Sequence, residues 1–194
     1  MGADALGFVL VPESPRHVTV DTVVSIVGSM PDRVARVGVV VNMIPGEVRK
    51  LAGDCGLTAI QAHGDESPEE CRAYGLPVVK ALPTGDHLDL DALAPYQEFP
   101  LLLDAAAGGA RGGTGRLANW VAARAAKDAG FRVLLAGGLS PENILEAVRA
   151  VEPVAIDLNS GVESGPGIKD PRRIGLAIEA LHDLEPFEET TWPW

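Results

Sequence analysis

Aromatic residues and cysteines are scarce in this sequence of 194 residues. Phe, Trp and Tyr together make up 5% of it, so the hydrophobic content of 46% rests mainly on Ala, Val, Leu and Ile. Aliphatic runs of this kind are typical of parallel strands that are buried on both faces. The two cysteines, Cys55 and Cys71, fit neither a metal site nor a disulfide framework, which favours a reducing compartment.

Positive charge is also in short supply. The sequence has 16 Lys and Arg residues against 27 Asp and Glu residues, a formal net charge of −11 at pH 7. A field of this sign repels nucleic acid and anionic membrane surfaces, so neither is an expected partner. If the substrate is an anion, local groups must hold it against the overall charge.

A long hydrophobic segment is missing as well. No stretch approaches the roughly 18 apolar residues that identify a membrane span. Met1 is not followed by the basic region of a signal peptide, and Asp4 interrupts the first apolar run. The sequence therefore predicts a soluble, cytoplasmic protein.

What the chain does contain is a repeated alternation of strand-like and helical patterns. The predicted strands cover residues 3–10, 37–41, 58–64, 77–82, 100–104, 131–138 and 153–161. The predicted helices cover residues 19–29, 45–55, 67–74, 88–94, 116–129, 141–150 and 171–182. In SPEEC, SPENI and DPRRI, a proline at the first helical position marks the start of a helix. We predict one domain over residues 1–182, followed by an acidic tail over residues 183–194.

Strict alternation of this kind predicts a parallel sheet with right-handed crossovers, in one of two architectures. Polar residues and glycines cluster directly after the strands, as in SPR, NMIP, QAHGDES, DAAAGG, AGGLSPEN and DLNSGVESGPG. A TIM (β/α)8-type barrel, whose loops converge on one face, explains this better than a doubly wound sheet with a single switch point. A complete barrel needs eight βα units, and this sequence supplies seven.

Two glycine-rich turns follow the last two predicted strands, AGGLSPEN (136–143) and NSGVESGPG (159–167). Backbone N–H groups in such turns can approach an anion, and barrels often build a phosphate site from these two loops. Tight turning without a ligand is the alternative. A third stretch, GARGGTGR (109–116), partly matches a dinucleotide-binding motif but lies too far beyond its strand. We interpret it as a loop that covers a substrate or as a simple turn.

Several ionisable residues stand at strand ends, where a barrel places its catalytic groups. Asp104 ends PLLLD and could act as a general acid, and Asp157 follows the last strand; a helix cap or a salt bridge is the alternative for both. His63 is either a substrate contact or a hydrogen-bonded structural residue, and Lys80 also stands at a strand end. Arg16 could pair with a carboxylate or phosphate, or could be solvated.

Taken together, these stretches resemble the phosphoribosylanthranilate isomerase family of tryptophan biosynthesis. The likeness runs in order from about residue 2 to about residue 180, through GADALGFVLVPESPRHV, VGVVVN, AIQAHGDESPEECR, VVKAL, LLLDA…GGTG, LAGGLSPENI and IDLNSGVESGPGIKD. The resemblance implies a (β/α)8 barrel with no metal and no organic cofactor. It also implies an Amadori rearrangement of N-(5′-phosphoribosyl)anthranilate to 1-(2-carboxyphenylamino)-1-deoxyribulose 5-phosphate.

The resemblance also implies a role for each candidate residue. Asp104 would be the general acid at the ring oxygen, Arg16 would bind the carboxylate, and His63 and Asp157 would contact the substrate. The phosphate-binding residues would be Gly137, Gly138, Ser160 and Gly161. The implied ligand is thus a small phosphorylated molecule.

The sequence departs from the family at its beginning. Family members start with a strand carrying a K-I-C-G-like motif and a helix, and the thiolate of that cysteine is the general base. This sequence starts at GAD, so we expect the first βα unit and the base to be missing, either because Met1 is an internal methionine or because the chain is shortened. A shortened chain could pair its open strand edges in a homodimer or cover them with its tail. It could then be a catalytically impaired phosphosugar-binding protein, or another phosphosugar isomerase on the same scaffold.

Overall fold

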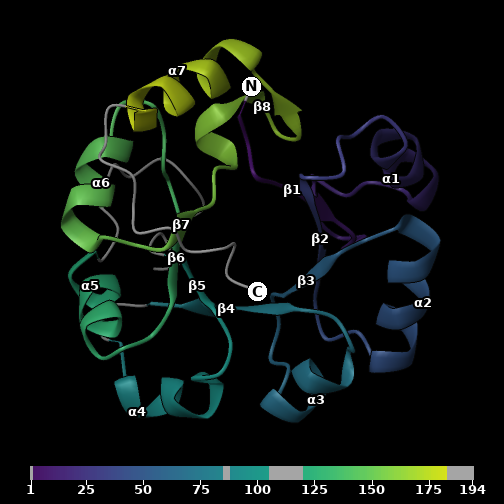
Figure 1. Cartoon of the computed structure of the whole chain (residues 1–194), viewed down its shortest axis with the longest axis horizontal. Helices are drawn as coiled ribbons and strands as arrows, with labels where there is room; N and C mark the ends of the chain where they lie inside the picture. Colours follow the sequence, from purple (N-terminus) through teal and green to yellow (C-terminus); the bar gives the residue numbers. More distant parts are fainter. Residues whose placement is uncertain (1, 85–87, 105–119, 183–194) are drawn as a thin grey trace. The chain divides into compact units, whose positions relative to one another are not determined.

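The structure is a computed structural model that describes residues 2–84, 88–104 and 120–182 (Figure 1). Seven strands form one sheet, and their order in the sheet is their order in the chain. These strands are β1 (Ala5–Val9), β2 (Ala35–Val40), β3 (Ala59–Ala62), β4 (Val78–Pro83), β5 (Leu101–Asp104), β6 (Val133–Ala136) and β7 (Ala155–Ile156). The predicted loop 109–116, the first residues of the predicted helix 116–129 and the tail 183–194 lie outside the described residues.

Helices follow the strands throughout the described part of the chain. They are α1 (Val20–Val27), α2 (Pro45–Cys55), α3 (Pro68–Ala73), α4 (Leu90–Leu93), α5 (Trp120–Asp128), α6 (Ile144–Val151) and α7 (Pro171–His182), with short 3₁₀ turns η1 (Ala94–Tyr96) and η2 (Ser160–Val162). Among these helices, none combines the length and the apolar character that a bilayer span requires.

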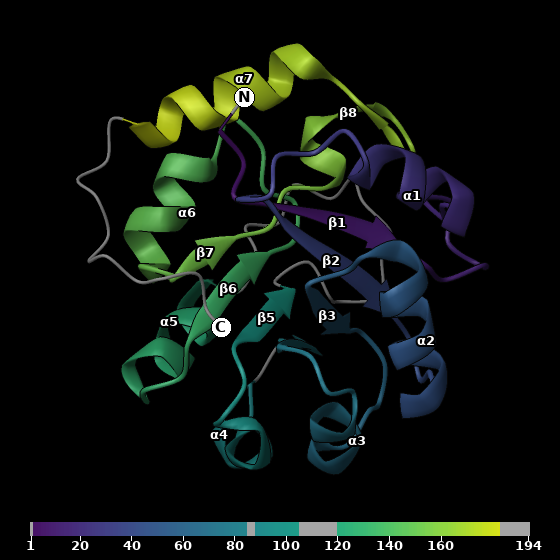
Figure 2. The same ribbon diagram turned by 45° about the vertical axis from the view of Figure 1, so that its right-hand side comes forward.

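The chain divides into two compact units, residues 2–81 and the residues from Leu82 onward. In the first unit, β1 pairs with β2, β2 with β3 and β3 with β4, always in parallel. Helices α1, α2 and α3 lie on one side of these strands in both views (Figures 1 and 2). Val23 of α1, Val48 of α2 and Ile60 of β3 are all buried.

In the second unit, β5, β6 and β7 are parallel neighbours that pack against α5 and α6. The core joins alternate strand residues to the helices, namely Leu101, Leu103, Val133, Leu135, Trp120, Ala123, Ala126, Ala147 and Val151. Successive side chains of a strand point to opposite faces. The residues in between, Asp104 among them, therefore point to the face of the sheet away from α5 and α6.

Sequential strand order confirms the barrel-type (β/α) architecture with seven βα units and excludes a doubly wound sheet. A doubly wound sheet reverses its strand order at a switch point, which this sheet does not do. No eighth strand of this sheet occurs among the described residues, and β1 and β7 are its terminal strands. The predicted bounds of α2 and α7 agree with the structure.

Two predictions near the end of the chain were wrong in detail. The predicted strand 153–161 is only β7, and an antiparallel hairpin of β8 (Glu163–Gly165) and β9 (Ile168–Lys169) follows it. The helix predicted to start at Pro141 starts at Ile144. The reason is that residues 140–143 form a turn closed by the Asn143 side chain, which is described below.

Candidate functional site

The turn after β6 is held in a shape that favours glycine. Gly137 and Gly138 have φ angles of 89° and 64°, in the left-handed region that other residues rarely adopt. The Asn143 side chain closes the turn, because its Nδ2 donates to the Gly138 carbonyl at 3.0 Å and its Oδ1 accepts from the Ser140 N–H at 2.9 Å. These two hydrogen bonds fix the shape of the turn.

The turn after β7 packs directly against the turn after β6. A Cβ atom on Gly161 would lie 1.8 Å from the carbonyl oxygen of Leu139, so only glycine fits there without movement of the backbone. This contact brings the four predicted phosphate-binding residues together, two on each turn. Gly161 is therefore needed for the close approach of the two turns, whereas Gly137 and Gly138 are needed for their φ angles.

Two basic residues fix the direction of the peptide groups in the second turn. Lys169 Nζ donates to the Asn159 carbonyl at 3.2 Å, and Arg173 Nε donates to the Gly161 carbonyl at 2.8 Å. In a trans peptide the N–H points away from the C=O, so the Ser160 N–H points away from Lys169. Within the described residues, the N–H groups of Gly138, Ser160 and Gly161 donate no hydrogen bond, which leaves them available to an anion.

Sequence reasoning did not identify Lys169 or Arg173. The signal was present in GIKD and DPRR, since two basic side chains close to a predicted phosphate turn are unusual in a chain of net charge −11. Both residues are held in turn by acids: Lys169 by Glu163 at 2.9 Å and Arg173 by Glu142 at 2.8 Å.

The two predicted catalytic-face acids, Asp104 and Asp157, lie on either side of β6. Asp104 is aligned with Ala136, and Ile156 is aligned with Leu135, so Asp157 is also level with Ala136. Adjacent strands are about 4.8 Å apart, which separates the two Cα atoms by about 10 Å. Both side chains are half-buried at the carboxyl ends of their strands, directly beside the start of the Gly137–Gly138 turn.

Arg16 and His63 belong to the other unit, in the loops after β1 and β3. Arg16 is half-buried, and its backbone N–H donates to Ser14 Oγ at 3.2 Å. His63 is exposed, its N–H donates to the Val40 carbonyl at 2.8 Å, and its Nδ1 lies 3.0 Å from the side-chain nitrogen of Gln61. Both residues therefore follow the carboxyl ends of strands, as predicted.

The two cysteines are unsuited to act as a thiolate. Cys71 lies within α3, and burial raises the pKa of its thiol to about 11. Cys55 is the last residue of α2, and burial raises its pKa as well. No cluster of three or more potential metal ligands from His, Cys, Asp and Glu occurs among the described residues.

Comparisons with known proteins agree with this arrangement. Residues 1–180 match the family described as N-(5′-phosphoribosyl)anthranilate (PRA) isomerase. The N-(5′-phosphoribosyl)anthranilate isomerase of Geobacter sulfurreducens is 47% identical over 173 residues, which is 89% of this chain and 85% of the relative. These matches confirm the resemblance, but they do not confirm the expectation that a first βα unit is missing.

Solved structures give the same result. Phosphoribosyl anthranilate isomerase from Thermotoga maritima superimposes with a TM-score of 0.87 at 38% identity, covering 94% of this chain and 90% of the other. A phosphoribosyl anthranilate isomerase in complex with reduced 1-(o-carboxyphenylamino)-1-deoxyribulose 5-phosphate superimposes with a TM-score of 0.83 at 36% identity, covering 94% and 89%.

Proposed function

Because the chain belongs to the N-(5′-phosphoribosyl)anthranilate isomerase family, we propose that its strand-end residues carry out each part of that reaction. The reaction is the isomerisation of phosphoribosylanthranilate in tryptophan biosynthesis. The observation that best supports a role for these residues is the level arrangement of Asp104 and Asp157 beside the Gly137–Gly138 turn.

Asp104 is the proposed general acid. It gives a proton to the furanose ring oxygen while the bond from that oxygen to C1′ breaks, and the nitrogen lone pair forms the C=N bond of an open-chain iminium ion. A base then removes the C2′ proton, which gives a neutral enol-amine. Transfer of a proton from the enol oxygen to C1′ gives the ketone, and the proton that the base has taken replaces the one that Asp104 has given. Asp157, on the other side of β6, lies beside the sugar in this scheme.

The two turns are the proposed phosphate site. N–H groups of Gly137, Gly138, Ser160 and Gly161 hold the phosphate, and the Asn159 carbonyl, which is held by Lys169, keeps the Ser160 N–H directed away from Lys169. Local donors of this kind can bind an anion in a protein of net charge −11. Arg16 and His63 are the proposed contacts of the anthranilate carboxylate and of the remaining substrate.

The general base is the remaining group, and we propose that neither cysteine supplies it. A raised thiol pKa leaves almost no thiolate at neutral pH, and both side chains are buried. A positioned general base typically contributes about 10²–10⁴-fold to a rate. We therefore expect neither Cys55 nor Cys71 to make a contribution of this size.

The test is a fluorescence assay that follows loss of phosphoribosylanthranilate. Asp104→Asn should lower kcat by about 10²–10⁴-fold relative to the unchanged chain, with little change in KM, because it removes a proton donor and keeps the shape. The double variant Cys55→Ala/Cys71→Ala is the control and should keep kcat. Unchanged kcat in Asp104→Asn would refute the acid role, and binding of substrate with no turnover in any version would favour a phosphosugar-binding protein.

A cytoplasmic location and a homodimer are also proposed. A phosphorylated substrate does not cross a bilayer, so the enzyme must work where the substrate is made. The terminal strands β1 and β7 each have one unpaired edge among the described residues, and strand edges of this kind favour association. Sedimentation of the purified chain would measure its mass.

A further inference from the structure

A buried ion pair lies in the first unit, outside the acid and phosphate groups described above. Lys80 on β4 and Glu66 in the loop after β3 are joined at 2.9 Å, and their side chains are 1% and 2% exposed. Removing two charges from water is costly, and replacing such a pair by uncharged residues is often neutral or even stabilising. The stability of the fold is therefore a weak reason for the pair to exist.

The contacts of the pair converge on one loop, residues 63–66. Lys80 Nζ donates to the carbonyl of Ala62 at 3.2 Å and to the carbonyl of Gly64, the residues on either side of His63. Glu66 Oε2 accepts from the Gly64 N–H at 2.9 Å. Both backbone groups of Gly64 are thus bound to the pair, one to each partner.

Asn42, which lies just after β2, completes this network of hydrogen bonds. Glu66 Oε1 accepts from the Asn42 N–H at 2.7 Å, and Asn42 Oδ1 accepts from the Asp65 N–H at 2.7 Å. Asn42 itself has a φ of 51°, and a Cβ atom on Gly64 would lie 2.2 Å from Asn42 Oδ1. The loop is therefore pressed against Asn42 and cannot shift without breaking several hydrogen bonds.

We propose that the Lys80–Glu66 pair positions His63, by fixing the backbone on both sides of a side chain that is itself exposed. Lys80 and Glu66 are positioning residues in this scheme, since neither reaches the substrate. The inference rests on the proposed substrate contact of His63. Lys80 lies in the middle of β4 and not, as the sequence had predicted, at its end, and the proposal explains why this buried position holds an ion pair where packing alone would favour an apolar residue.

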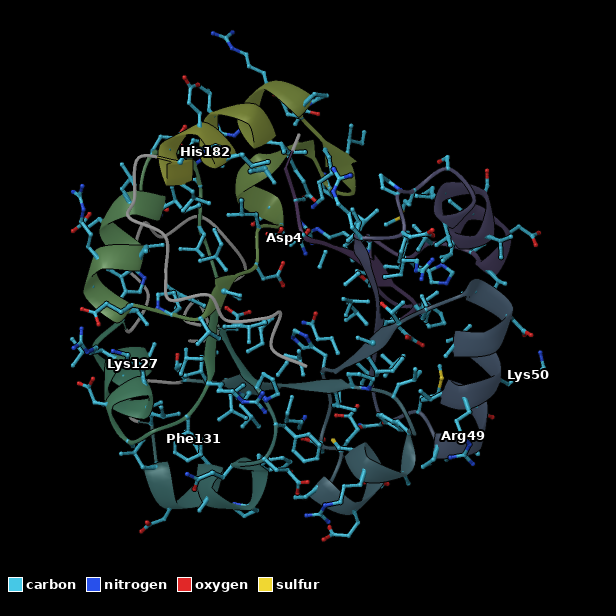
Figure 3. All side chains as sticks on the ribbon, in the orientation of Figure 1. Asp4, Arg49, Lys50, Lys127, Phe131 and His182 are labelled. Atoms are coloured by element: carbon cyan, nitrogen blue, oxygen red, sulfur yellow. The ribbon has the colours of Figure 1, made fainter. Side chains whose placement is uncertain are left out.

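The main variant is Lys80→Met/Glu66→Gln, because either single change would leave a buried charge unpaired. The control is Lys50→Met/Asp54→Asn, which removes an exposed ion pair on α2, where Lys50 points away from the strands (Figure 3). The probe is reduced 1-(o-carboxyphenylamino)-1-deoxyribulose 5-phosphate, and calorimetry gives its dissociation constant. We expect the main variant to bind about 10-fold to 100-fold more weakly, since small misplacements have effects of this size, and the control to bind normally.

A double-mutant cycle with His63→Ala shows whether the effect passes through His63. In that background the main variant should weaken binding by less than about 2-fold, because coupled residues are not additive. Equal losses with and without His63, or unchanged binding, would overturn the proposal. NMR of the His63 imidazole in the ligand-free protein is the second readout, and its signals should move in the main variant and not in the control.

Failure of the proposed function can be told apart from failure of this inference. If His63→Ala alone leaves binding unchanged, the substrate contact is wrong, and the NMR signals of His63 still decide whether the pair positions it. If the main variant does not fold, Asn42→Gly replaces it. That change keeps the left-handed backbone but removes the Oδ1 acceptor, and it should weaken binding in the same His63-dependent way; normal binding would refute the proposal.

Discussion

Gly161 shows how a single residue determines the shape of the phosphate site. The atom nearest to its absent side chain is a backbone oxygen, that of Leu139, and backbone cannot rotate out of the way as a side chain can. Any larger residue must push the two turns apart. This requirement differs from that of Gly137 and Gly138, which are needed for their φ angles.

We predict that Gly161→Ala weakens binding of the reduced product analogue by about 10-fold or more and destabilises the protein by about 1–3 kcal/mol, the usual cost of overpacking. Gly165→Ala is the matched control, since a Cβ atom there has nothing within 4 Å and no positive φ has to be maintained. Calorimetric titration and thermal unfolding give both quantities. Normal affinity in Gly161→Ala would show that the turns can separate freely.

Helix α3 starts at a signal, a capping box, that is formed by residues close together in the sequence. Ser67 Oγ accepts from the Glu70 N–H at 3.2 Å, and Glu70 Oε2 accepts from the Ser67 N–H at 2.8 Å, which is a complete capping box ahead of Pro68. All three residues are close neighbours in the chain. The helix therefore starts at the position that the local sequence predicts.

Removal of this cap should cost about 1 kcal/mol, within the usual range of about 0.5–2 kcal/mol. We expect Ser67→Ala to lower the free energy of unfolding by that amount, as measured by urea denaturation. Ser25→Ala, on the exposed surface of α1, is the control and should change it little. Equal stability of the two variants would mean that α3 is held by packing alone.

Helix α6 has a start signal like that of α3, but its start could not be predicted from the sequence. SPENI contains the same Ser-Pro-Glu signal as SPEEC, yet α6 starts later because Asn143 bonds to Gly138 and Ser140 instead of capping a helix. Those two hydrogen bonds depend on the left-handed turn after β6, which the Ser-Pro-Glu pattern does not predict. Strand order and the strand-end location of Asp104 and Asp157 could be predicted because the βα unit repeats. The ion pair of Lys80 with Glu66 could not be predicted, because it depends on the strand register that aligns Lys80 with Ala62.

For the molecule as a whole, the buried carboxyl group of Glu66 contributes to the way stability changes with pH. Burial by itself would raise the pKa of Glu66, but hydrogen bonds from Lys80 and from backbone N–H groups hold it below its usual value. A carboxyl group with a lowered folded pKa contributes its stabilisation above its unfolded pKa of about 4.3 and loses it as the pH falls through the folded pKa.

We therefore predict that the free energy of unfolding decreases below about pH 4.3 and that Lys80→Met/Glu66→Gln decreases less steeply, because it has no such group to protonate. Urea denaturation at several pH values between 7 and 3 measures both curves. The Lys50→Met/Asp54→Asn control should follow the unchanged protein. Parallel curves for all three proteins would show that Glu66 does not contribute to acid sensitivity.

The contact between Gly161 and Leu139 also limits how this protein could be rebuilt. Barrel enzymes gain new chemistry mainly through changes in individual strand-end loops, each of which can vary on an unchanged scaffold. Here the backbone of one turn fills the space that a side chain of the other would need, and Lys169 and Arg173 support the second turn from behind. A graft between relatives would have to transfer residues 137–140 and 159–173 together, as one exchangeable module.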